Sequence, residues 1–135
     1  MVEQQWMIAR AGDKRLALSL EETWAVLDSP AVRPLPGARP WCAGWVAFQD
    51  HVVPVLGGGG YSRLGRPEVL LVVERQGALL GIPCQHATLC KGFLSDNSGE
   101  EGEAGLPFAG AVEAPGTEAA WRMDLERLYS VLGIQ

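Results

Sequence analysis

The stretch Trp41-Cys-Ala-Gly-Trp-Val-Ala-Phe-Gln-Asp-His-Val-Val-Pro-Val55 decides the fold class of this chain. Valine and aromatic residues, which favour strands, lie on both sides of Gln49-Asp50, a pair that suits a tight turn because Asp tolerates a positive φ. The pattern predicts a hairpin of two strands, residues 42–48 and 51–56. Pro54 has no N–H to donate, so we expect it at an edge or a bulge.

The residues before this hairpin predict another one. Apolar side chains alternate with polar or small ones on both sides of a turn at Gly12-Asp13; they are Trp6, Ile8, Leu16, Leu18 and Leu20. Ser19 and Glu22 then have the spacing of a capping box. That spacing predicts a short helix that begins at Ser19 and ends at about Leu27, because a proline follows at position 30.

The second half of the chain repeats this order of elements. We expect strands at 68–75, 78–82, 108–113 and 120–123, and a final helix with Asp124 as its cap, Leu125, Leu128 and Leu132 on one face and Gly133 as its stop. The glycine run 57–60 predicts an irregular hinge or boundary between the halves. The glycines and acidic residues between Ser95 and Gly105 predict an exposed loop.

Spacing supports an internal duplication. The turn glycines Gly12 and Gly77 are separated by almost the same number of residues as Gly44 and Gly110, which occupy matching Ala-Gly positions in the two halves. Each half has too few strands to bury a sheet face unless it closes into a barrel or packs against its twin. Two packed barrels would leave an apolar groove suited to a partner helix or strand.

Composition narrows the class of protein. The chain has 135 residues, 47% of them hydrophobic, which suits one compact domain that folds alone. A net charge of -5 without a run of Lys or Arg argues against nucleic acid as a partner. We expect a soluble cytoplasmic protein without signal peptide or membrane insertion, and we interpret Cys42, Cys84 and Cys90 as reduced, buried thiols.

Residues 35–55 also resemble the most recognisable stretch of the CheW family of bacterial chemosensory adaptors. That family has an L-P-G lead-in, then a proline, an aromatic residue and, after two intervening residues, a glycine; here these are Leu35-Pro-Gly37, Pro40-Trp41 and Gly44. A turn of pattern N-L-R-G and an apolar pair before P-V follow, and Val52-Val-Pro-Val55 matches the end of this pattern. The order of elements agrees over nearly the whole chain.

The resemblance implies a mainly β fold of two five-stranded SH3-like barrels with short helices. One CheW-like domain would span residues 1–135, with a first subdomain at about 14–66, a second at about 67–123, and terminal strands and helix exchanged between the halves. It also implies a scaffold without catalytic residue, metal or cofactor. The partners would be the cytoplasmic tips of methyl-accepting chemoreceptors and the regulatory domain of a CheA-type histidine kinase. The implied binding residues are Val26, Leu27, Cys42, Gly44, Trp45, Val46 and Gln49.

This chain departs from the family pattern at a charge pair. The family usually has an acidic residue and an arginine where Ala25 and Gln49 stand here. Removal of one member of a buried charge pair leaves the other charge buried without a partner, which costs about 3–5 kcal/mol. Loss of both charges together avoids that cost. We therefore hypothesise an adaptor with one altered interface: it retains receptor binding and binds the kinase weakly or not at all.

Other readings of the residues stay open. Cys84, His86 and Cys90 have the spacing of a partial metal site or of a thiol nucleophile, as in a small thiol- or metal-dependent enzyme. Trp24, Trp41 and Trp45 are candidates for an aromatic binding platform or for core. The acidic residues between Asp96 and Glu103 lack the ligand rhythm of a calcium loop, which favours a solvated loop.

Overall fold

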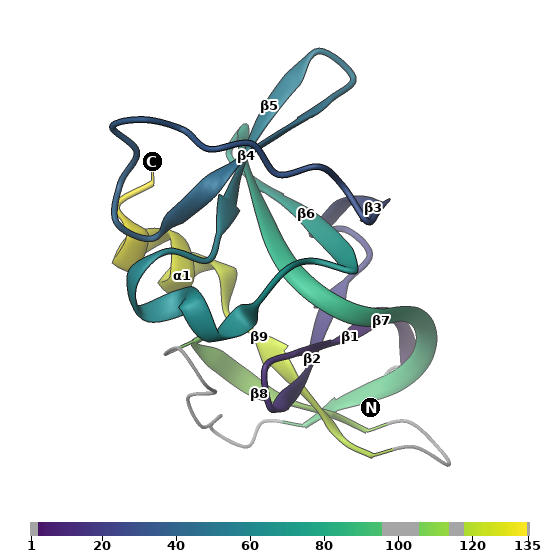
Figure 1. The fold of residues 1–135 in the computed structure, drawn as a ribbon. Coiled ribbons are helices and arrows are strands. Elements are labelled where there is room, and N and C mark those ends of the chain that lie inside the picture. The colour runs from purple at the N-terminus through teal and green to yellow at the C-terminus, as the bar shows by residue number, and fades with distance from the viewer. Residues whose placement is uncertain (1–2, 96–105, 114–117, 135) are drawn as a thin grey trace.

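The computed structural model describes residues 3–95, 106–113 and 118–134. These residues form a mainly β fold with one α-helix and one 3-10 helix (Figure 1). The elements in chain order are β1 (Glu3–Ala11), β2 (Lys14–Ser19), β3 (Thr23–Asp28), β4 (Cys42–Phe48), β5 (His51–Leu56), η1 (Gly59–Leu64), β6 (Val69–Arg75), β7 (Ala78–Ser95), β8 (Phe108–Glu113), β9 (Ala120–Met123) and α1 (Leu125–Leu132).

Five strands close into a ring, which we name sheet A. β1 pairs with β2, β2 with β9, β9 with β8, β8 with the C-terminal part of β7, and that part of β7 pairs back with β1. The β2–β9 pair is parallel and the others are antiparallel. Sheet A therefore combines both ends of the chain, and its closure leaves no free strand edge within the described residues.

The remaining strands form sheet B, which stays open. Its order is β3-β6-β7-β5-β4, and it uses the N-terminal part of β7. No strand of the described residues pairs with the outer edge of β3, and the outer edge of β4 meets only an isolated bridge between Arg33 and Trp45. The two five-stranded sheets agree with the predicted pair of small barrels. The subdomain bounds of about 14–66 and about 67–123 remain a prediction.

β7 joins the two sheets. It runs for 18 residues and appears in Figure 1 as one long curved ribbon. Cys84 is the last residue of β7 that pairs with β6, and Gln85 is the first residue of β7 that pairs with β1. His86, with a φ of 54°, lies at the irregularity where the strand changes sheets. A bulge bends the strand at this point, so one strand serves both sheets.

Buried side chains form three clusters that match this architecture. Sheet A encloses a small cluster around Trp6 and Val112, and sheet B encloses one around Val53 and Val72. The largest cluster draws on both sheets and on α1, whose Leu125, Leu128 and Leu132 are buried. Much of the space between the sheets is therefore packed core, as expected from the size of the apolar surface that each sheet must bury.

The terminal helix follows its sequence signals. The Asp124 carboxylate accepts a hydrogen bond of 3.1 Å from the Arg127 backbone N–H, and Gly133 ends α1 in the left-handed conformation. The Tyr129 hydroxyl donates to the carbonyl of Ala78 at 2.8 Å, with the carbonyl of Val73 at 3.3 Å. These contacts hold α1 against the β6–β7 turn.

The predicted short helix before Leu27 is wrong. The Glu22 carboxylate does accept hydrogen bonds from the Ser19 backbone N–H and hydroxyl, at 3.3 and 3.0 Å. Those bonds close a turn, after which Thr23–Asp28 continues as β3. Threonine, tryptophan and valine favour extended backbone, and pairing with β6 provides the hydrogen bonds that a helix would have made internally.

Other boundaries also need correction. The strand predicted to end at Ile82 continues to Ser95 as β7. The glycine run is not irregular throughout, because Gly59 and Gly60 begin η1. The strand pairs at 42–48 with 51–56, and 108–113 with 120–123, are confirmed. The acidic loop after Ser95 lies outside the described residues.

Backbone geometry supports the duplication. Gly44 and Gly110 both have a φ that L side chains rarely adopt, 154° and 138°. Each also lies at a register shift in its hairpin, between β4 and β5 and between β8 and β9. The two halves thus have a glycine at a register shift in matching hairpins, as an internal duplication would leave.

Candidate functional site

Three of the predicted binding residues line one groove between the unpaired edges of sheet B. Val26 and Leu27 come from β3 and Val46 from β4. We name this recess the β3–β4 groove; it has a volume of about 380 Å³, and its other lining residues are Asp28, Pro30, Ala31, Arg33, Ala47 and Phe48. Val26 is 39% exposed, whereas Val46 is buried and forms part of the sheet B core. Exposed valine at an unpaired edge is a surface that a partner can cover.

Cys42 belongs to a second recess. We name it the apolar cleft; it measures about 290 Å³ and is lined by Leu35, Gly37, Ala38, Arg39, Trp41, Cys42, Pro54, Leu79 and Ile134. The Cys42 thiol donates to the carbonyl of Gly44 at 3.1 Å. The Trp41 indole N–H is buried without a hydrogen-bond partner among the described residues. A buried donor without an acceptor is unfavourable, so this indole is an unusual feature of a side chain that lines the cleft.

Gly44 and Trp45 attach the segment after β3 to the edge of β4. Arg33 and Trp45 exchange two backbone hydrogen bonds, of 2.9 and 2.8 Å. A Cβ at Gly44 would overlap the carbonyl oxygen of Arg33, so the close approach of the two backbones requires glycine. The Arg33 guanidinium lies 5.7 Å from the centre of the Trp45 ring. Gly44 is therefore a positioning residue beneath the surface that Trp45 and Arg33 present.

Gln49 lies away from both recesses, at the tip of the β4–β5 hairpin. It is exposed, and Gln49 and Asp50 have φ values of 47° and 63°, as a two-residue hairpin turn requires. Beside this turn, the Trp24 ring meets Phe48 and His51 edge-on, at centroid distances of 5.6 and 5.1 Å. Aromatic contacts thus join β3 to the hairpin, next to Ala25 and Gln49 in the sequence.

The tryptophans do not form one platform. Trp24 packs at the hairpin tip, Trp41 in the apolar cleft and Trp45 against Arg33, and each is half-buried. The sequence did not single out Arg33, Phe48, His51 or Ile134 as site residues. No local pattern marks them, because they come from different elements that only the fold brings next to the predicted residues.

The Cys84, His86 and Cys90 group is split by the strand that carries it. Cys84 is buried in the core, and burial raises the pKa of its thiol well above the ordinary value. His86 is exposed and Cys90 is half-buried. Within residues 3–95, 106–113 and 118–134, no three potential ligands converge as a metal site would need. A thiol with a raised pKa is a poor nucleophile at neutral pH.

The fold and the two recesses described above thus define a class: a small β protein in which the apolar cleft and the β3–β4 groove are lined largely by apolar side chains. Comparison with protein families gives the particular family. The model of the CheW-like domain matches residues 5–129, so the chain belongs to the CheW-like family.

One solved structure confirms the fold. The scaffolding protein TtCheW from Thermoanaerobacter tengcongensis matches with a TM-score of 0.64 and 13% sequence identity, over 93% of this chain and 86% of that one. The search of curated proteins finds no significant match. Among the described residues, no helix is long and apolar enough to cross a bilayer.

Proposed function

We propose that this protein is a non-enzymatic adaptor of a bacterial chemosensory pathway that acts in the cytoplasm. It couples the tips of methyl-accepting chemoreceptors to a CheA-type histidine kinase. The observation that supports this role most directly is the presence of two separate recesses on sheet B. An adaptor must hold two partners at once, and that requires two surfaces that do not overlap.

The apolar cleft is the proposed receptor site. Its walls carry Leu35, which is 43% exposed, with Pro54, Leu79 and Ile134. An amphipathic helix binds such a cleft by inserting apolar side chains from one face. A polar side chain next to that face would accept the hydrogen bond of the Trp41 indole. The receptor tip is helical in this family, which fits these requirements.

The β3–β4 groove and the hairpin tip form the proposed kinase site. Val26 and Arg33 line the β3–β4 groove, Arg33 contacts Trp45, and Gln49 is exposed at the hairpin tip; another β domain can pack against the unpaired strand edges beside them. Neither Ala25 nor Gln49 carries charge, so a kinase that relies on the usual pair binds here more weakly. Receptor binding without kinase binding is the alternative form of this proposal.

Matched charge insertions test the two sites. Leu35→Glu and Val26→Glu each place a carboxylate on an exposed apolar position, so both variants are expected to fold. Leu35→Glu should reduce affinity for a receptor-tip fragment at least tenfold, and Val26→Glu should do the same for the kinase regulatory domain. Calorimetric titration of each variant with each partner measures this. If both variants weaken both partners equally, the two surfaces are not separate sites.

A smaller change tests the indole. Trp41→Phe keeps an aromatic ring in the apolar cleft and removes the N–H. We expect affinity for the receptor tip to fall about three- to tenfold, as loss of one buried hydrogen bond predicts, while the free energy of unfolding stays the same or rises. Affinity for the kinase domain should not change. Unchanged receptor affinity would show that the receptor does not use this donor.

A further inference from the structure

The central part of the chain has a charge unlike the rest. Residues 29–67 contain Arg33, Arg39, Arg63 and Arg66 and a single acidic residue, Asp50, whereas the whole chain has 11 basic and 16 acidic residues. An acidic protein that concentrates arginines in one region creates a local positive potential there. Arginine is also the side chain best suited to bidentate recognition of carboxylates.

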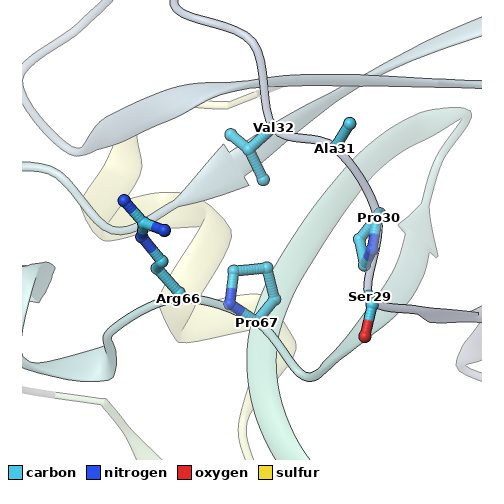
Figure 2. A pocket seen from close by; sticks show the side chains of 6 residues that line it. All are labelled: Ser29, Pro30, Ala31, Val32, Arg66 and Pro67. Atoms are coloured by element: carbon cyan, nitrogen blue, oxygen red, sulfur yellow. The ribbon is translucent and has the colours of Figure 1, made fainter.

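Two of these arginines flank one ridge. Pro30 and Ala31 form a wall shared by two recesses: Arg33 lines the β3–β4 groove on one side. Arg66 lines a third recess on the other side, which we name the Arg66 cleft; it has a volume of about 410 Å³ and is lined by Ser29, Pro30, Ala31, Val32, Arg66 and Pro67. Figure 2 shows the Arg66 guanidinium extending toward Val32, at the opposite end of the cleft from Ser29.

The walls of the Arg66 cleft are held in place by the backbone. Ser29 has a φ of 40°, which is uncommon outside glycine, and its N–H donates to the carbonyl of Glu68 at 2.8 Å. Pro30 and Pro67 restrict the chain on either side of this bond. A rigid recess loses little conformational entropy when a ligand binds.

The cleft has a charged end and an apolar floor. Arg66 is exposed, and within the described ranges its guanidinium forms no ion pair. Pro30, Val32 and Pro67 supply apolar surface beside it (Figure 2). At the other end, Asp28 directly precedes Ser29 in the chain and Glu68 is hydrogen-bonded to Ser29 through its backbone carbonyl, so two acidic residues adjoin that end and disfavour a second anion there. A ligand therefore needs one carboxylate at the Arg66 end and an apolar group next to it.

We propose that the Arg66 cleft binds an extended acidic segment of a partner protein, in which an Asp or Glu side chain pairs with Arg66 and a neighbouring apolar side chain packs on Pro30 and Pro67. Arg33, across the ridge, strengthens the attraction. The Arg66 cleft shares Pro30 and Ala31 with the β3–β4 groove but has its own charged residue, Arg66, so failure of the kinase site proposed above would not by itself overturn this proposal.

Three peptides test the chemistry with the full chain. They are acetylated, amidated nonapeptides in which valine alternates with glutamate, glutamine or lysine. The glutamate peptide should bind at least tenfold more tightly than the other two, and its affinity should fall as salt rises because the contact is solvent-exposed. Amide shifts in NMR spectra should be confined to residues 29–33 and 66–68. Equal affinity of the three peptides would overturn the proposal.

Two arginine variants assign the contact. Arg66→Gln should weaken the glutamate peptide about two- to fivefold, the magnitude expected for a solvent-exposed ion pair, and Arg66→Glu should favour the lysine peptide instead. Arg63→Gln is the matched control, since Arg63 is exposed on η1 and does not line the cleft. An equal loss in Arg63→Gln would indicate general charge attraction. Displacement of the peptide by millimolar inorganic phosphate would show an anion site without peptide specificity.

Discussion

The two sheets of this molecule have the same number of strands but end differently. In sheet A the fifth strand pairs back to the first, so Trp6 is completely buried inside a closed ring and its indole N–H donates to the Gly92 carbonyl at 3.2 Å. In sheet B the outer strands β3 and β4 do not pair with each other. Of the valines on these outer strands, Val26 is exposed and Val46 is buried in the core.

This difference separates stability from binding. Every residue that the family resemblance marked as a partner contact lies on β3, on β4 or, for Gln49, in the turn after β4, and none lies on the closed ring. A closed ring has no free edge to offer, whereas an open sheet leaves backbone groups and apolar side chains that another chain can cover. We therefore expect changes in sheet A to alter folding and changes at the edges of sheet B to alter binding.

The largest expected effect is that of Trp6→Ala. The ring fills the interior of sheet A, so its removal should cost about 3–5 kcal/mol in free energy of unfolding. Trp45→Ala, on the half-buried edge of sheet B, should cost about 1 kcal/mol, the scale of its contact with Arg33. Urea unfolding followed by circular dichroism measures both. Similar costs for the two tryptophans would remove the distinction between the sheets.

The next effect is that of Gly44→Ala. A Cβ would overlap the Arg33 carbonyl oxygen and the φ of 154° is strained for alanine, so we expect a loss of about 2–3 kcal/mol and release of the segment after β3. Gly60→Ala is the control, because nothing lies within 4 Å of a Cβ there. Thermal unfolding and NMR shifts of Arg33 report the two consequences. A neutral Gly44→Ala would show that the segment has room to move.

A pH effect of intermediate size follows from Cys84, where β7 leaves sheet B. Burial raises the pKa of this thiol, so the folded protein keeps the proton that the unfolded chain releases above about pH 8.5. The protonated thiol therefore contributes its full share to the free energy of unfolding below that pH. This contribution is lost as pH rises, at about 1.4 kcal/mol per pH unit. Stability measured between about pH 8 and 10 should fall less steeply in Cys84→Ala. Identical slopes would contradict a buried neutral thiol.

The loss of stability with rising pH should continue at higher pH because of the Tyr129 hydroxyl. Burial, helped by the Glu74 carboxylate, raises the pKa of its hydroxyl, so stability should decrease further as pH rises above about 10. Tyr129→Phe should remove this second phase and cost about 1 kcal/mol at neutral pH through its lost hydrogen bond to Ala78.

The smallest expected effect is that of Val26→Thr. This change keeps the shape of the side chain and adds a hydroxyl that water can reach, because Val26 is 39% exposed, so stability should change by less than about 0.5 kcal/mol. Val112→Thr buries the same hydroxyl inside sheet A, where Val112 is 1% exposed, and should cost about 1–3 kcal/mol. Chemical denaturation of the pair compares the two sheets at constant side-chain volume.

Much of the fold could be predicted because its signals are local. Alternation of apolar residues and the turn at Gln49-Asp50 defined the central hairpin, and Asp124 and Gly133 bounded the terminal helix. The candidate site was predictable only in part. Val26, Leu27 and Val46 do share a groove, but Cys42 lines a different recess and Gln49 lies in neither.

The capping-box error shows why local signals have limits. Ser19 and Glu22 form the hydrogen bonds that their spacing predicts, yet the residues that follow pair with β6, which is far away in the sequence. A hydrogen-bonded turn is compatible with a helix or with a strand. Only the availability of a distant partner strand decides between them.

The sequence by itself determined the hairpins, the terminal helix and the mainly β class, because turn chemistry and side-chain periodicity act over a few residues. The tertiary structure alone decided that β7 serves two sheets, that sheet A closes and sheet B does not, and that Arg33 and Arg66 flank one ridge. Those outcomes depend on pairing between strands many residues apart. That pairing reflects which apolar surfaces can be buried together, a property of the whole chain and not of any single segment.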